Sequence, residues 1–353
     1  ELRYDNVKRL ETTSTGISVT GGIVGSADAT INGITLGRGA NNQGTNAVFG
    51  VNAVRTTDTA AYHLTAIGHL ALSSTNLSGR ENTAIGSSAL KNNETARYNV
   101  AVGMNALRDT ISGGSNTAIG NDALESLTTG TQNVAIGLNA GVNVTTGSNN
   151  VLLRGGGNIT TASEIIGIGG NTCTSATGDK NIGIGSAVLN DANFSGSYNI
   201  GLGWGAASNL SSGNYNIAMG RDAMQGSYTS GEEITGNHNT AIGYHAQENL
   251  KDGQHNIGIG QNALRANVSA DYNIAFGNNA LNANTTGTRN TAIGGFSLNA
   301  NTTGNDNVAL GYQSGADITT ASNNTAIGRS ALASNTTSSN NVAIGYEALT
   351  SNT

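Results

Sequence analysis

The chain reads NTAIGRSAL from Asn324 to Leu332 and NVAIGYEAL from Asn341 to Leu349, so nearly the same nine residues return after 341 − 324 = 17 positions. The glycine of this motif keeps a spacing of 17 over the last seven repeats, and earlier, less regular copies reach back to Gly50. A fixed short period is the sequence signature of stacked structural repeats. The sequence therefore predicts an all-β solenoid, or β-roll, of coils about 17 residues long.

The composition fits such a solenoid better than an ordinary globular fold. Of 353 residues, 11% are charged, against roughly 25% in typical soluble domains. There are 51 glycines, no proline and only 4% aromatic residues. Few large apolar groups usually indicate disorder, but disordered chains are also rich in charge and proline. We expect short strands whose backbone hydrogen bonds and repeated small contacts replace one large core.

The columns of the repeat predict an inside and an outside for each coil. A large apolar residue precedes the glycine and a tiny one lies two before it, and strand side chains alternate between faces. We interpret the large residues as the core, together with a leucine column four residues after the glycine. The predicted core includes Ile85, Ile119, Ile136, Ile242, Ile293, Ile327, Ile344, Leu90, Leu107, Leu124, Leu264 and Leu332.

The remaining columns predict corners, a ladder and a close contact. Ala and Gly on the second face indicate close approach by another backbone layer or by another subunit. Asn and Gly tolerate positive φ, so they are expected at the corners. The asparagine that starts each strand is expected to form a side-chain ladder along the stack, as stacked amides do. Its last members are Asn239, Asn256, Asn273, Asn290, Asn307, Asn324 and Asn341.

The Asn-Thr/Val-Ala-Ile-Gly pattern resembles the head repeats of trimeric autotransporter adhesins, which form left-handed parallel β-rolls in trimers. Leu2–Gly21 (LRYDNVKRLETTSTGISVTG) and Ile31–Gly50 (INGITLGRGANNQGTNAVFG), followed by the repeat array, are more similar to bacteriophage tail-fibre and receptor-binding proteins. This resemblance covers almost the whole chain. It implies a parallel homotrimer in which residues 1–30 form an intertwined lead-in and residues 31–353 form the repeat rod.

Little in the sequence points to chemistry. A net charge of −6 gives no electrostatic footprint for nucleic acid, and no apolar run is long enough to span a bilayer. The single cysteine, Cys173, falls in the leucine column and is expected to be buried. His238, His245 and His255 lie on adjacent coils, but we place them in different columns and expect no metal site. We expect no cofactor and no enzymatic activity.

The irregular parts of the array are better candidates for contact with a receptor. The spacing rises to 243 − 220 = 23 between Gly220 and Gly243, which places an insertion within residues 221–239, and residues 150–170 break the register. Insertions in solenoids form loops on one face. Aromatic residues that follow a corner glycine could stack on sugar rings or on a neighbouring subunit. The candidate contacts are Tyr228, Glu232, Glu233, Trp204, Tyr244, Tyr312 and Tyr346.

We therefore expect a structural segment of a phage tail fibre that acts in attachment to a host surface. Its expected partners are two further copies of itself, a host cell-surface glycan or protein, and other virion tail proteins. One alternative is a trimeric adhesin or extracellular filament subunit of a cell. Another is a glycan-degrading tailspike, which needs two carboxyl groups facing one groove at about 5–9.5 Å.

Overall fold

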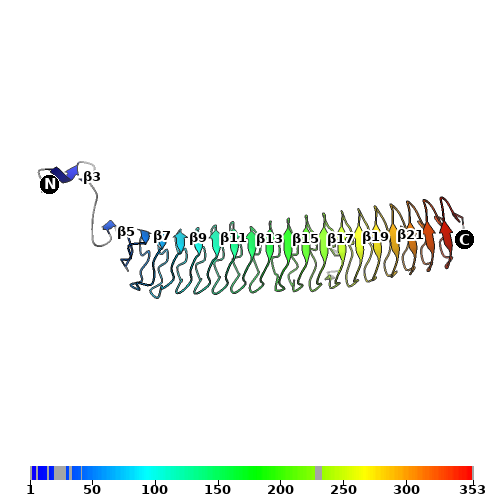
Figure 1. Ribbon diagram of the computed structural model, residues 1–353, viewed down its shortest axis with the longest axis horizontal. Coiled ribbons are helices and arrows are strands. Elements are labelled where there is room, and N and C mark those ends of the chain that lie inside the picture. The colour runs from blue at the N-terminus through cyan, green and yellow to red at the C-terminus, as the bar shows by residue number, and fades with distance from the viewer. Residues whose placement is uncertain are drawn as a thin grey trace.

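The computed structural model describes residues 2–4, 7–13, 16–19, 29–31, 34–40, 42–226 and 233–351. Every regular element in these ranges is a β-strand, and none is a helix. From β6 onward the chain winds into coils that stack side by side into a long rod, with β6 near one end and the C-terminus at the other (Figure 1). The predicted β-solenoid of about 17-residue coils is confirmed.

The first strands are antiparallel. A three-stranded sheet contains β1 (Leu2–Tyr4), β2 (Val7–Thr13) and β3 (Gly16–Val19). The larger sheet starts with the antiparallel strands β4 (Ala29–Ile31) and β5 (Ile34–Gly37) before β6 (Ala47–Gly50). Parallel pairing begins between β6 and β7, so the repeat rod starts near residue 47. The intertwining expected of residues 1–30 stays a prediction.

The remaining strands are three residues long and pair in parallel, each with the next along the chain. The middle residue of each strand lies beside the middle residue of its neighbour, as Ala292 lies beside Ala309. The strands are β7 Thr65–Ile67, β8 Thr83–Ile85, β9 Val100–Val102, β10 Thr117–Ile119, β11 Val134–Ile136, β12 Val151–Leu153, β13 Ile166–Ile168, β14 Ile182–Ile184, β15 Ile200–Leu202, β16 Ile217–Met219, β17 Thr240–Ile242, β18 Ile257–Ile259, β19 Ile274–Phe276, β20 Thr291–Ile293, β21 Val308–Leu310, β22 Thr325–Ile327 and β23 Val342–Ile344.

The two faces of this sheet are the reverse of what the sequence predicted. The middle residues, such as Ala118, are buried, and so is the leucine column up to Leu332. Burial of the leucines Leu90, Leu107, Leu124, Leu264 and Leu332 is confirmed. The isoleucines point outward, so the prediction that they form the core is wrong. Ile85, Ile119, Ile136, Ile293 and Ile344 are exposed, and Ile242 and Ile327 are half-buried.

The thickness of a coil explains this reversal. The interior of each coil must hold the leucine that comes from the wall opposite the strand. A methyl group at the middle strand position leaves room for that leucine in a densely packed interior. Where the strand carries Leu152 instead, the leucine column has Gly141, on which a Cβ would lie 2.7 Å from the Leu152 side chain. The strand alternation then directs the residues on either side of the alanine outward. The small face therefore lies against another backbone layer of the same coil.

The corners use left-handed conformations at more than glycine and asparagine. Gly294 has φ of +130°, and a Cβ there would lie 2.5 Å from the carbonyl oxygen of Gly311 on the next coil. The leucine column also turns with positive φ, for example 46° at Leu298. A leucine in this region carries a backbone cost of roughly 1–2 kcal/mol, which its complete burial offsets. Leucine corners were not predicted from the sequence.

The asparagine ladder is confirmed as a buried hydrogen-bonded column. The Asn290 backbone N–H and Nδ2 both donate to Oδ1 of Asn273, at 3.0 and 3.2 Å, and Nδ2 also donates to the Gly304 carbonyl at 2.7 Å. The ladder breaks at Ile165, whose backbone N–H still donates to Asn150 Oδ1. This break lies in the irregular stretch 150–170, where Arg154 holds the corner with φ of 61°.

Candidate functional site

The predicted contact residues do not gather into one site. Tyr228 and Glu232 lie outside the described residues. Glu233 is exposed and accepts a hydrogen bond of 2.9 Å from Asn193 Nδ2. Beside it, burial and the charge of Glu233 raise the pKa of Asp191, while the Asn193 backbone N–H lowers it. This corner of the rod is separate from the four aromatic residues.

Trp204, Tyr244, Tyr312 and Tyr346 form part of one column, directly after the corner glycines. Their exposed fractions run from 44% to 63%. Trp204 lies one coil before Arg221 and Tyr244 lies one coil after it, and Arg329 lies between Tyr312 and Tyr346 along the column in the same way. Each pair of rings therefore has a guanidinium between its members. Sequence reasoning missed both arginines, although writing out the column would have found them.

Arg221 is the better fixed of these two arginines. Its guanidinium carbon lies 5.3 Å from the centre of the Trp204 ring and 5.8 Å from that of Tyr244. Its Nε donates to Oδ2 of Asp222 at 3.1 Å. The Asp222 side chain is 5% exposed, whereas that of Arg221 is 63% exposed. The positive member of this ion pair therefore faces solvent while the negative member lies beneath it.

A network of charges holds Asp222 from behind. Gln225 Nε2 donates to Asp222 Oδ1 at 2.8 Å, and His245 Nε2 lies 3.7 Å from Asp222 Oδ2. His245 Nδ1 is 2.7 Å from Glu248 Oε1, and Arg265 Nε donates to Glu248 at 2.5 Å. Burial disfavours the charge on Glu248, but these contacts outweigh it and lower its pKa below the ordinary value.

A second feature missed from the sequence is a stack of five rings. Tyr198, Tyr215, His238, His255 and Tyr272 lie on successive coils with centroids 4.8–5.0 Å apart and interplanar angles of 3–12°. His238 and His255 share this column, so the expectation that all three neighbouring histidines occupy different columns is wrong; His245 alone lies elsewhere. The sequence does show this stack, because an aromatic or histidine residue stands immediately before the ladder asparagine in five consecutive repeats.

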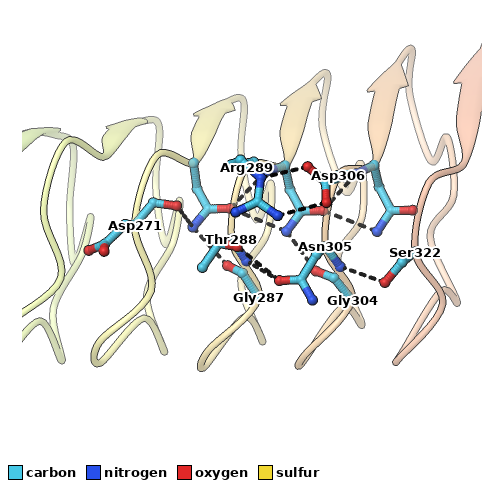
Figure 2. Close-up of polar contacts among 11 residues, drawn as sticks. Asp271, Gly287, Thr288, Arg289, Gly304, Asn305, Asp306 and Ser322 are labelled. Carbon is cyan, nitrogen blue, oxygen red and sulfur yellow. Dashed lines mark hydrogen bonds and ion pairs between the residues drawn. The ribbon is translucent and has the colours of Figure 1, made fainter.

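Charged residues flank this stack. Lys180 Nζ lies 5.0 Å from the centre of the Tyr198 ring and donates to its hydroxyl at 3.1 Å. Arg289 follows on the coil after Tyr272 and pairs with Asp306 through contacts of 2.7 and 2.8 Å. Figure 2 shows Arg289 and Asp306 pointing toward one another across neighbouring coils. The hydrogen bond from Arg289 lowers the pKa of Asp306.

Metal-ligating side chains are dispersed over the described part of the chain. Within the described ranges no three His, Cys, Asp or Glu side chains lie where they could share a metal ion. Cys173 is buried in the leucine column as predicted, and this burial raises the pKa of its thiol to about 12. The residues that the structure describes also include no helix that could span a membrane.

Comparison with family models, curated proteins and solved structures found no match. The candidate site is therefore defined by its own geometry: an exposed, stacked arginine between two aromatic residues, anchored by a buried carboxylate.

Proposed function

We propose that this chain is a structural segment of a bacteriophage tail fibre, assembled as a homotrimer that supports attachment of the virion to a host surface. One observation carries the assembly: the outer face of the parallel sheet is apolar along the rod. Outward residues on β6, β10, β15, β19 and β23, namely Phe49, Ile119, Leu202, Phe276 and Ile344, are 37–69% exposed. From β7 onward, threonine, valine or isoleucine occupies the first strand position, and Ala47 occupies it in β6.

The size of this apolar stripe favours an extended partner. Coils stacked about 4.8 Å apart from β6 to β23 give a length of roughly 80 Å. Two outward rows per strand make the stripe roughly 10 Å wide, so its area is about 800 Å². That exceeds the roughly 300–600 Å² of the largest apolar patch on a typical monomer. It also equals the roughly 800 Å² that each partner contributes to a standard interface.

A second copy of this chain is the partner that fits best. The stripe repeats with the rise of the coils, and another rod of the same rise can match it over its whole length. A globular partner would cover only a few coils. The number three and the phage origin rest on the resemblance of the repeats and of Leu2–Gly50 to trimeric fibre proteins. In this proposal the chain belongs to the virion and contacts other tail proteins and host glycans or proteins.

The experiment that tests the assembly changes the stripe without changing the interior. Ile119→Lys combined with Ile136→Lys puts two charges on adjacent strands of the apolar face. Charges that lose water without a partner disfavour association. Light scattering after size exclusion should give three chain masses for the native protein and a smaller mass for this variant.

The matched control is Ile111→Lys. Ile111 is 42% exposed, close to the 39% of Ile119, but lies in a turn and outside the strands. It should leave the mass unchanged. A native protein that runs as one chain would contradict the proposal, and so would equal dissociation by both variants. The absence of enzymatic activity is tested separately, by looking for new reducing ends after incubation with capsule glycans.

A further inference from the structure

We propose that Arg221, with Trp204 and Tyr244, binds the acidic sugar residues of a surface glycan through the carboxylate of the sugar. This inference rests on the proposed attachment function and names the class of ligand. The stacked guanidinium would receive the carboxylate of the acidic sugar, and the face of Trp204 away from Arg221 would receive the apolar face of the neighbouring sugar in the glycan chain. The neighbouring coils supply the space, the charge and the rigidity that such a site requires.

The orientation of Arg221 suits a carboxylate ligand. Its Nε is used by Asp222, which leaves Nη1 and Nη2 for a ligand in a side chain that is 63% exposed. Two parallel N–H groups match the two oxygens of a carboxylate. Because Asp222 is buried, its charge holds the guanidinium in place while the surface above remains positive.

The backbone of the preceding coil holds Asp222 in place before any ligand binds. A Cβ on Gly205 would lie 2.5 Å from Asp222 Oδ1, so glycine is required for the carboxylate to fit there. Asp222 also has positive φ, and its backbone N–H donates to the Trp204 carbonyl at 2.9 Å. A main-chain contact thus fixes the backbone of the aspartate, and the aspartate in turn positions the guanidinium of Arg221. A fixed binding group loses little conformational entropy when a ligand arrives.

Space for the sugar next to the acidic one lies on the side of Trp204 away from Arg221. The same column continues there with Ser186 and Gly170 on the two preceding coils. A Cβ built on Gly170 would meet no atom within 4 Å. Two coils with small residues make a shelf roughly 10 Å long beside the indole. An indole face beside an open shelf can receive the apolar face of a sugar ring.

The second aromatic–arginine triplet lacks these features. Arg329 lies 5.7 Å from the centre of the Tyr346 ring, but Ser330 occupies the position that Asp222 has beside Arg221. Gly295 precedes Tyr312, and the Tyr312 ring already lies 3.4 Å from where a Cβ on that glycine would be. The shelf there is covered by the tyrosine itself. We therefore assign the site to Arg221 and not to Arg329.

The test uses the chain's own reporter, because Trp204 is its single tryptophan. The full-length protein is titrated with D-glucuronate while the tryptophan emission is recorded, with D-glucose and sodium acetate as comparison ligands. We expect a saturable change with glucuronate in the millimolar range, and at least tenfold weaker responses to glucose and to acetate. Equal responses to glucose and glucuronate would overturn the assignment.

Variants separate the site from general charge effects. Arg221→Gln should weaken glucuronate binding at least tenfold, and Arg221→Lys should also weaken it because the planar fork is lost. Arg289→Gln removes the same charge from another column and should bind like the native protein. Unchanged binding by Arg221→Gln, with circular dichroism like that of the native protein, would overturn the assignment.

A control on access distinguishes this inference from the proposed assembly. Acrylamide should quench Trp204 in the native assembly, and glucuronate should reduce that quenching. A tryptophan that is shielded without ligand would show that a neighbouring copy covers the column, and the assignment would fall. A mass of three chains without glucuronate binding would contradict the sugar site and leave the proposed trimer standing. Glucuronate binding by a protein with the mass of one chain would contradict the trimer and leave the sugar site standing.

Discussion

At the scale of single residues, the buried asparagine is the most demanding part of the repeat. Asn290 lies fully inside the coil, where an unpaired amide would be costly. Its Oδ1 accepts both the backbone N–H and Nδ2 of Asn307, each at 3.0 Å. Each ladder asparagine therefore satisfies groups on its own coil and on the next.

We predict that Asn290→Ala destabilises the middle of the rod by at least about 3 kcal/mol, because several buried donors and acceptors lose their partners at roughly 1–3 kcal/mol each. Hydrogen exchange at the amide of Asn307 measures this as faster local opening. Asn278→Ala, at an exposed position, should stay within about 0.5 kcal/mol. Equal exchange in the two variants would show that the ladder contributes little.

The corner glycine gives a second prediction. Gly294→Ala should destabilise its coil by at least about 2 kcal/mol, because the new Cβ meets the next coil and φ of +130° is strained for alanine. Gly170→Ala provides the control, since nothing lies within 4 Å of its Cβ and no strained φ is involved. The thermal midpoint of each variant checks this, and a similar fall in both would count against it.

At the scale of the coil, the alternation of residues predicted two faces correctly but not which of them is inside. The deciding information was present in the asparagine column. Asn324 and Ala326 are two apart and share a face, and a ladder of hydrogen-bonded amides gains most where water is excluded. A position that holds alanine or glycine in all but two strands, where Val48 and Leu152 stand, is a packed position. Thickness, which depends on the opposite wall, could not be read from the strand motif alone.

The candidate site, too, could be predicted only in part from a single repeat motif. The aromatic members Trp204 and Tyr244 were identified from their place after the corner glycine. Arg221 and its buried carboxylate were not, because their importance depends on neighbours 17 to 23 residues away that meet only in the stack. The ring stack from Tyr198 to Tyr272 was missed for the same reason. Columns of the repeat, compared across coils, carry that information.

Contacts between coils also make the stability depend on pH. The pKa of Glu248 lies below its ordinary value of 4.5 in the folded chain. The hydrogen bond from Arg108, which also contacts Glu125, likewise lowers the pKa of Asp109 below 3.8. A carboxyl whose folded pKa is lowered contributes stability that is complete above its unfolded pKa. That contribution is lost as the pH falls through the folded pKa.

We predict that Glu248→Gln lowers the thermal midpoint at pH 7 and that this difference shrinks as the pH falls from about 4.5 toward 3. The corresponding loss in the free energy of unfolding at pH 7 should be about 1 kcal/mol or less, because solvent screens part of the interaction. Arg265→Gln should reduce the same pH dependence, since it removes the partner of Glu248. A difference that stays constant from pH 7 to pH 3 would show that the charge of Glu248 is not responsible.

At the scale of the whole molecule, the rod buries its leucine column and presents the isoleucines of its strands on one outer face. Ladders of backbone hydrogen bonds, the asparagine column and the leucine column stabilise each coil against the next, as in other stacked repeats. The outer isoleucines are then available for other copies of the chain. In the proposed trimer these isoleucines would move from solvent into an interface, which would explain why the strand carries them on its outer side.

Small-angle X-ray scattering of the full chain in solution tests this claim most directly, because one curve gives both the length and the mass per unit length. The account predicts a rod whose repeat array spans roughly 80 Å, at about 4.8 Å per coil, with the mass per length of three chains side by side. A rod of that length with the mass per length of one chain would contradict it.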